Sequence, residues 1–372
     1  MRKCLVSMIA AVIAVYGAVA LAGPPLGLPP VPVPENNPQT PDKIKLGEKL
    51  FNDKRFSVTK EVSCATCHAA EKGFTDLLPV SEGINKLTGT RNAPTVINAA
   101  YNKTQFWDGR EPSLEEQSKQ PFVNPVEMGL KNHEPILKIV RSDPEYVEMF
   151  KSAFGKTGNQ ITMEEVKMAI GSFERTIIAG NSPFDRYYFG EDKTAMSKAA
   201  IRGLDVYLNQ GRCVSCHTIE QTSAVFTDHK FHNIGTGFDR IARDVGELAG
   251  EYAKAKAKGA DVDVEVLTNK NVSELGRFAV TVQISEMGAF KTSTLRNVAI
   301  TAPYMHDGSM KTLKEVVEFY NNGGIVKKKD PVNDFQSGGI RPLNLTDQQI
   351  EDLVAFLEAL TSPEFADQQK KQ

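Results

Sequence analysis

The sequence predicts a mostly α-helical protein composed of two related domains. Three observations support this fold class: apolar residues recur at spacings of three and four, one five-residue cysteine motif occurs twice, and several short segments repeat in the same order. The chain has 372 residues, of which 24% are charged and 41% hydrophobic. This length and balance agree with two folded domains and exclude a disordered chain, a collagen or a small disulfide-rich domain.

A secretory signal peptide is predicted over residues 1–22. Two basic residues precede an apolar run from Leu5 to Leu21, and the run ends in Ala20-Leu21-Ala22, a sequence typical of signal cleavage. Cleavage after Ala22 would deliver the mature protein to the periplasm. The alternative is an uncleaved membrane anchor, because about 17 apolar residues can just span a bilayer.

The rest of the chain is slightly acidic and begins with a proline-rich stretch. Without Arg2 and Lys3, 42 of the 44 basic residues remain against 46 acidic ones, and this net charge of −4 argues against nucleic acid as a partner. Residues 23–41 contain eight prolines, which predicts an extended tether without a packed core. We therefore expect the folded part to begin near Asp42.

Six segments of the folded part have the apolar spacing of helices. Thr162 with Glu165, and Thr346 with Gln349, resemble the capping boxes that mark helix starts. Strand signals are few, and the best is Phe278–Ile284. The predicted helices are Lys43–Phe51, Ser113–Lys119, Pro135–Val140, Pro144–Phe154, Thr162–Ile178 and Thr346–Leu360.

The cysteines carry the most specific signal. Of five cysteines, Cys4 leaves with the signal peptide, and the other four form two copies of C-x-x-C-H, the attachment motif of c-type haem. One helical turn places both thiols within reach of the porphyrin vinyl groups, and the next residue turns its imidazole onto the iron. A zinc site would gather four ligands in one place, and a disulfide framework has no use for the histidines. The expected haem ligands and attachment residues are Cys64, Cys67, His68, Cys213, Cys216 and His217.

The second half of the chain repeats short segments of the first half in the same order, so each half is predicted to wrap around one covalently bound haem. We assign residues 42–185 to the first haem domain, 186–362 to the second, and 363–372 to a tail. The paired segments are Phe74-Thr75-Asp76 with Phe226-Thr227-Asp228, Arg91-Asn92 with Arg296-Asn297, and Trp107-Asp108-Gly109 with His306-Asp307-Gly308.

The two halves differ at one position that bears on metal binding. Fourteen residues after Trp107 the chain has Pro121, and fourteen after His306 it has Tyr320. Proline has no metal-binding atom, whereas a tyrosine oxygen can ligate haem iron. If this position faces the distal side of both haems, the first iron is open to a small ligand and the second is six-coordinate.

Other readings of these residues stay open. Tyr320 can be an aromatic side chain packed at a helix end, and Met305 or Met310 can ligate the second iron instead. In the first half, Glu127 is the candidate base for peroxide cleavage, with Gln117 as a hydrogen-bonding companion, although surface carboxylates of no function are common. The only tryptophan, residue 107, is either a core residue or an aromatic group between the haems.

Several further segments make the chain similar to the bacterial dihaem cytochrome c peroxidase and MauG family over nearly all of its mature length. Besides the two cysteine motifs, they are residues 91–95, 106–110, 125–128 and 295–304. The resemblance implies a peroxidatic N-terminal haem on His68 and an electron-transferring C-terminal haem on His217. It implies that Trp107 lies between the haems and that Gln117 and Glu127 lie at the peroxide pocket.

The resemblance also implies a calcium ion at the domain interface, bound by the Asn92 side chain and the carbonyls of Thr301 and Pro303. Two departures from the peroxidase pattern matter. Many of these peroxidases carry a distal histidine where this chain has Ile84, so the first haem is expected to be open without prior reduction. The axial methionine of the second haem is replaced by Tyr320, as in MauG, and an anionic oxygen ligand lowers the haem potential.

Three functions follow from these expectations. The first is a periplasmic peroxidase that reduces hydrogen peroxide to water with electrons from a small cytochrome c or copper protein. The second is a MauG-like enzyme, in which peroxide-derived high-valent haem oxidises side chains of a partner protein; Tyr320 favours it. The third, a non-catalytic dihaem electron carrier, gains nothing from an open iron. The donor, the haem potentials and a homodimer are left open.

Overall fold

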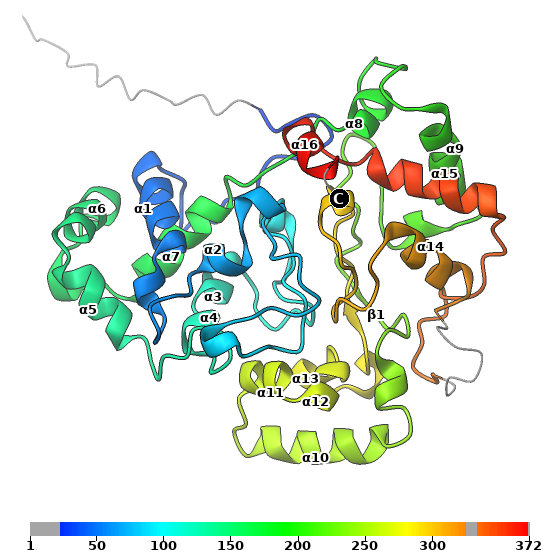
Figure 1. The fold of residues 1–372 in the computed structure, drawn as a ribbon. Helices are drawn as coiled ribbons and strands as arrows, with labels where there is room; N and C mark the ends of the chain where they lie inside the picture. The colour runs from blue at the N-terminus through cyan, green and yellow to red at the C-terminus, as the bar shows by residue number, and fades with distance from the viewer. Residues whose placement is uncertain (1–22, 325–332, 371–372) are drawn as a thin grey trace, which may run out of the picture.

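The computed structural model describes residues 23–324 and 333–370, and the predicted helical character is confirmed (Figure 1). Helices α1–α7 form one body, α9, α14 and α15 form a second, and α10–α13 form a third group beside both. No helix of the described part is long and apolar enough to cross a membrane. The only strands in that part are β1 (Phe231–His232) and β2 (Phe290–Lys291), an antiparallel pair.

The helix bounds agree with most of the predicted segments, and both predicted capping boxes are present. The helices of the first body are α1 Pro41–Asn52, α2 Cys64–Cys67, α3 Leu114–Ser118, α4 Gln120–Val123, α5 Glu134–Ser142, α6 Pro144–Phe154 and α7 Met163–Glu174. The others are α8 Pro183–Tyr188, α9 Lys198–Leu208, α10 Val245–Ala257, α11 Val262–Thr268, α12 Lys270–Glu274, α13 Phe278–Thr281, α14 Leu313–Asn321, α15 Asp347–Glu358 and α16 Ala366–Gln369.

The same helix crossing underlies both domains. In the first, α1 packs on α7, and a Cβ atom placed on Gly47 would overlap the carbonyl of Ala169. In the second, α9 packs on α15, and a Cβ atom on Gly203 would overlap the carbonyl of Asp352. Each crossing has a glycine at the point of closest approach, so Gly203 corresponds to Gly47 and residue 352 corresponds to residue 169.

One pairing of the predicted repeat is wrong. The structural counterpart of Asn297 is Asn98 and not Asn92, because both have positive φ angles (59° and 63°) and begin a short 3₁₀ helix. Asn98 binds the backbone of Ala179 on the chain that leaves α7, and Asn297 binds Ser362 on the chain that leaves α15. Each asparagine also precedes Trp107 or His306 by nine residues, so the rest of the repeat keeps its register.

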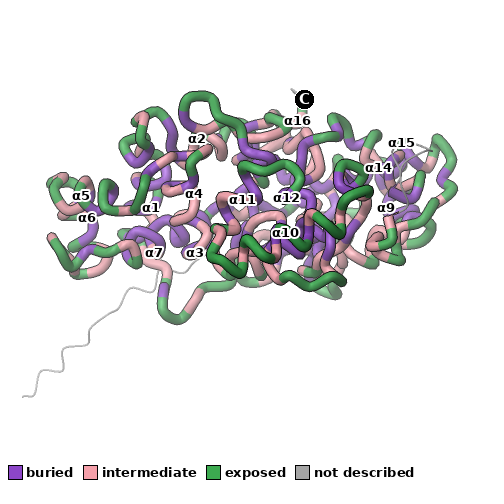
Figure 2. The backbone as a smooth tube through the Cα atoms, turned by 90° about the horizontal axis from the view of Figure 1, so that it is seen from below, coloured by how far each residue is buried: buried purple, intermediate pink, exposed green. Residues whose placement is uncertain are grey.

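A third hydrophobic core, formed by α10–α13, was not foreseen. The predicted strand Phe278–Ile284 is wrong, since Phe278 and Ala279 are buried in this core as part of helix α13. Val282 ends the helix with a φ of 59°, and Ile284 is 69% exposed. Figure 2 shows exposed residues along the outer side of α10 and buried residues where this group of helices meets the rest of the molecule.

The proline-rich segment has no helix or strand before Pro41 and turns at residues 26–27 and 35–37, and the prediction of a tether without packing is wrong. Leu28 is buried, and the carbonyl of Gly27 accepts hydrogen bonds from Ala224 (2.9 Å) and Arg296 (2.6 Å) in the second domain. Asn37 donates to Glu115 in the first domain (2.8 Å). Proline-rich backbone has few donors of its own, so its free carbonyls can satisfy buried donors of both domains.

The ends of the second domain also differ from the assigned bounds. The boundary between 185 and 186 falls inside α8, whose Phe184 belongs to the core of the second domain. The tail from residue 363 is folded where it is described: Phe365 packs against the first core, and Gln368 donates to the carbonyl of Ala70 (3.1 Å). At both places a phenylalanine, Phe184 or Phe365, packs against a hydrophobic core although polar residues flank it.

Candidate functional site

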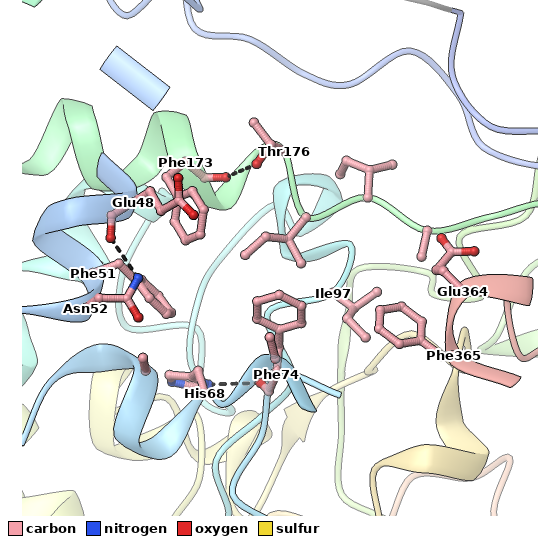
Figure 3. A pocket seen from close by; sticks show the side chains of 15 residues that line it. Glu48, Phe51, Asn52, His68, Phe74, Ile97, Phe173, Thr176, Glu364 and Phe365 are labelled. Carbon is pink, nitrogen blue, oxygen red and sulfur yellow. Dashed lines mark hydrogen bonds between the residues drawn. The ribbon is translucent and has the colours of Figure 1, made fainter. Parts of the chain in front are cut away.

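The first cysteine motif has the local geometry that haem attachment requires. Cys64 and Cys67 begin and end helix α2, and the amide of His68 donates to the carbonyl of Cys64 (2.9 Å). The Nδ1 atom of His68 lies 3.2 Å from the carbonyl of Phe74, which has a φ of 56° (Figure 3). This bond fixes the ring and leaves Nε2 free to bind iron.

The second motif repeats this arrangement. The amide of His217 donates to the carbonyl of Cys213 (2.9 Å), and its Nδ1 atom lies 2.9 Å from the carbonyl of Phe226, whose φ is 59°. All four cysteines of the described chain are free thiols, so none is used in a disulfide. Two free thiols followed by an oriented histidine in each domain fit one c-type haem per domain.

The second motif opens into a cavity of about 300 Å³ that brings several predicted residues together. Cys213, Cys216, His217 and Tyr320 all line it. Met305 also lines it, whereas Met310 does not, which leaves Tyr320 and Met305 as the candidate second ligands. Burial, and then the neighbouring sulfur groups, raise the pKa of the Tyr320 hydroxyl above its usual value.

The same cavity reaches the predicted interface residues. Trp107, Asn92, Thr301 and Pro303 line it from the side of the first domain and of the loop after Asn297. The indole Nε1 of Trp107 donates to the backbone carbonyl of Asn92 (2.9 Å), and the backbone amide of Asn92 donates to the carbonyl of His306 (2.8 Å). Trp107 therefore lies where the two domains meet, beside the second haem site.

These residues also fit the expected calcium ion in their chemistry. The Nδ2 atom of Asn92 donates to the carbonyl of Leu78 (2.8 Å), which fixes the amide and leaves Oδ1 without a hydrogen bond to any described residue. Calcium prefers oxygen ligands of this kind, including amide and backbone carbonyls. Thr301 and Pro303 line the same cavity and supply two such carbonyls.

Glu127 is a buried carboxyl group near the first motif. Its Oε2 atom has no hydrogen-bond partner among the described residues, and burial followed by repulsion from Asp263 raises its pKa to about 8, against the attraction of Arg110. Its charge contributes, after burial and Asp76, to raising the pKa of the Cys67 thiol to about 12. Glu127 is therefore close enough to the first haem site to affect a group that binds there.

Backbone hydrogen bonds join Ile84 to Glu127, and Pro121 to the residue after Glu127. The amide of Ile84 donates to the carbonyl of Glu127 (2.9 Å), and the carbonyl of Pro121 accepts from Met128 (3.2 Å). Gln117 is half-buried on α3, one turn before Pro121, and its side chain makes no hydrogen bond to a described residue. Neither Ile84 nor Pro121 has a side-chain atom that can bind iron.

A buried charge network behind Glu127 was not predicted. Arg91 and Arg110 both pair with Asp108 (2.8 and 3.1 Å), and Arg110 also pairs with Asp263 (2.7 Å). Asp263 lies on α11 of the third group, about 150 residues from its partners in the chain. The arginines stood in the family motifs, but no sequence signal connected them with Asp263.

A second cavity of about 470 Å³ lies behind the His68 ring (Figure 3). Phe51, Phe74 and Phe173 line its inner part, and Phe365 lies across it beside Ile97. Because Phe74 also supplies the carbonyl that holds His68, this cavity borders the proximal side of the first haem site and is separate from Glu127.

Comparison with known proteins decides the family. The family model described as di-haem cytochrome c peroxidase matches residues 41–193. The chain is 36% identical over 345 residues to the cytochrome-c peroxidase IdrP1 of Denitromonas iodatirespirans, an alignment covering 92% of this chain and 87% of that one. The chain belongs to the di-haem cytochrome c peroxidase and MauG family. It is therefore an oxidoreductase, and the description of the family specifies two haems.

Relatives of both kinds are similar to this chain. The methylamine utilization protein MauG of Methylorubrum extorquens is 33% identical over 330 residues, covering 89% of this chain and 81% of MauG. A crystal structure of a MauG-like protein associated with microbial copper homeostasis superimposes with a TM-score of 0.73 at 32% identity, covering 92% of this chain and 97% of that one. The resemblance stated from the motifs is confirmed.

Proposed function

We propose that this protein reduces hydrogen peroxide to water in the periplasm, with electrons from a small cytochrome c or a copper protein. The overall reaction takes two electrons and two protons per peroxide and yields two molecules of water. The observation that carries the proposal is Glu127, a buried carboxyl group with an unpartnered oxygen beside the first haem motif. The side chains of Ile84 and Pro121 have no atom that could bind the iron in place of peroxide.

Glu127 moves the proton in this proposal. The haem on Cys64, Cys67 and His68 supplies, when bound, an iron at which the peroxide oxygen–oxygen bond is reduced. The ionised Oε2 atom of Glu127 takes the proton from one peroxide oxygen and returns it to the departing one. A pKa of about 8 suits both directions of this transfer near neutral pH, and Gln117 is the proposed partner that orients the substrate.

The second domain is proposed to deliver electrons. His217 and Tyr320 would hold the iron of the second haem, and Trp107 would carry electrons between the haems because it lies where the two domains meet. Covalent attachment through the cysteine pairs, and a calcium ion on Asn92, Thr301 and Pro303, belong to the same proposal. The periplasmic location depends on residues 1–22, which lie outside the described residues, and a homodimer is left to measurement.

A second candidate function is oxidation of side chains in a partner protein, as in the MauG branch. Tyr320 favours it, since an oxygen ligand lowers the potential of the second haem and makes it a weaker acceptor of electrons from an ordinary donor. The similarity to MauG itself supports this alternative to the same degree as the similarity to the peroxidases.

One stopped-flow experiment separates the two functions. The diferric protein is mixed with hydrogen peroxide, and reduced small cytochrome c is then added while its oxidation is followed. Rapid oxidation of the donor without prior reduction of the enzyme supports the peroxidase. Long-lived oxidised haem species with little donor oxidation support the MauG-like function, and no reaction with peroxide contradicts both.

A further inference from the structure

The first domain buries a second carboxyl group that the proposed reaction does not use. Glu174 ends helix α7 and is only 5% exposed, and its Oε2 atom has no hydrogen-bond partner among the described residues. Burial of a carboxyl group without a partner is unfavourable, so such groups are rare in folded proteins and usually serve a purpose. The position of Glu174 indicates what that purpose is.

The shared helix crossing gives Glu174 an exact counterpart in the second domain. Since Ala169 corresponds to Asp352, Glu174 corresponds to Leu357 on α15. Leu357 lines the cavity of the second haem together with Leu353, one turn earlier. The same face of α7 therefore borders the first haem site, and it presents a carboxyl group where the second domain presents an isobutyl group.

The electrostatics of the first motif agree with this placement. After burial, the charge of Glu174 is the largest influence that raises the pKa of the Cys64 thiol. Cys64 is one of the two attachment residues for the first haem. Glu174 is therefore close to the porphyrin edge that would be joined to Cys64, on the side of the site that α7 borders.

Among the described residues, no cation forms a salt bridge with Glu174. Arg175, the residue directly after α7, instead makes two hydrogen bonds to Glu115 of α3 (2.6 and 2.9 Å). Lys43 of α1 is engaged by Asn37 and Pro38. Burial raises the pKa of Glu174 to about 8, with Arg175 lowering it and Glu115 raising it.

We propose that Glu174 sets the reduction potential of the first haem, by placing a carboxyl group against the haem edge at Cys64. In its ionised form this group stabilises oxidised iron over reduced iron, because a negative charge in a poorly solvated site interacts strongly with the added positive charge. On oxidation of the haem by one electron, the carboxyl group releases its proton to solvent. The inference rests on the proposed function only in requiring a haem on Cys64 and His68.

Reductive titration of the holoprotein in the absence of peroxide tests this proposal. The potentials of both haems are measured by absorbance for the wild type, for Glu174→Gln, and for Glu164→Gln as a control. Glu164 is an exposed acid at the other end of α7, so its substitution makes the same charge change far from the haem. Glu174→Gln is expected to raise the potential of the first haem, with little change in the second and none in the control.

The pH dependence sharpens the test. The wild-type and Glu174→Gln potentials are expected to converge at pH 6, where the carboxyl group is protonated, and to diverge above pH 8, where it is ionised. Glu127 is present in both proteins and cancels from the comparison. Glu174→Leu, which installs the residue of the second domain, is the second variant and should raise the potential of the first haem in the same way. It keeps the test decisive if Glu174→Gln loads haem poorly.

Potentials of the first haem that coincide with the control at every pH, in both variants, would overturn the proposal. That result leaves the peroxidase function intact, because no peroxide is used. A wild-type protein that lacks haem at Cys64 would instead overturn the proposed function, and this inference with it.

Discussion

The two domains hold their histidines in the same way and differ in what surrounds them. In both, a histidine Nδ1 atom binds the carbonyl of a phenylalanine with positive φ, and a glycine lets two helices cross closely. At equivalent positions, however, the first domain has Pro121 and Glu174 where the second has Tyr320 and Leu357. The two domains therefore share a scaffold and differ in the side chains at these two positions.

The space behind the histidine differs as well. In the second domain, the ring of Phe184 lies between Phe226 and Phe356, with centroids 5.2 and 5.7 Å away. Their counterparts in the first domain, Phe74 and Phe173, line the open cavity of Figure 3. Among the described residues, the corresponding space of the first domain is the cavity lined by Phe74 and Phe173, so the core behind His217 is packed more firmly than the one behind His68.

The largest expected effect concerns the acid–base group that only the first domain has. Glu127→Gln removes the proton acceptor, so peroxide cleavage should slow by about 10²–10⁴-fold, the usual contribution of such a group. The rate is measured by stopped-flow absorbance of the diferric protein with peroxide. Glu134→Gln, an exposed acid on α5, is the control and should leave the rate unchanged. Equal rates in both variants would mean that Glu127 is not the base.

Removal of the Phe184 ring, which fills the space behind His217, should make the second domain resemble the first. Phe184→Ala leaves a cavity in the core and is expected to cost about 3–5 kcal/mol of unfolding free energy. Denaturant unfolding, followed by absorbance of the second haem, measures the loss. Phe365→Ala, at the half-buried edge of the first-domain cavity, should cost clearly less. A similar loss in both variants would contradict the difference in packing.

The helix crossings should respond alike, since they are the shared part of the scaffold. Gly47→Ala and Gly203→Ala each force a methyl group onto a facing carbonyl, which should cost about 1–3 kcal/mol or more. Gly250→Ala is the control, because a Cβ atom there meets nothing within 4 Å on helix α10 and alanine favours the helix. Thermal unfolding measures all three. Tolerance of alanine at only one crossing would show that the domains are not built alike.

The smallest effect tests how the third group tunes the first domain. Peroxide cleavage should accelerate with rising pH as Glu127 ionises, with a midpoint near its pKa of about 8. Asp263→Asn removes a repelling charge, so the midpoint should move to lower pH, by about one unit or less. Glu265→Gln, on the same helix, is the control. An unshifted midpoint in Asp263→Asn would separate the rate from this network.

Short motifs predicted the local arrangement around the cysteines, whereas long-range packing could not be predicted from them. The cysteine motifs could be found from their spacing and Trp107 from the repeat, whereas Glu127 is singled out by its place in the family segment 125–128. Asp263 could not be found from the sequence, since its partner Arg110 lies 153 positions away and the two are brought together only by the fold. Glu174 could not be predicted from the sequence, because a glutamate at a helix end normally faces solvent. Its burial follows from the helix crossing, of which Gly47 is the only sign in the sequence of the first domain.

The predicted strand at Phe278–Ile284 failed for a related reason. Its run of apolar residues fits a strand or a buried helix equally, and the third core, which sequence alone did not indicate, selects the helix. The proline-rich segment was predicted to be extended, and it contains two turns. Its packing between the domains depends on donors such as Arg296, whose burial composition cannot predict.

The central claim is that the first haem is open and the second is closed by Tyr320. Electron paramagnetic resonance of the diferric wild type and of Tyr320→Phe tests it most directly. The account predicts one high-spin signal, which cyanide abolishes at one equivalent, and one low-spin signal that becomes high-spin in Tyr320→Phe. Two low-spin signals in the untreated wild type, or a low-spin signal unchanged in Tyr320→Phe, would contradict it.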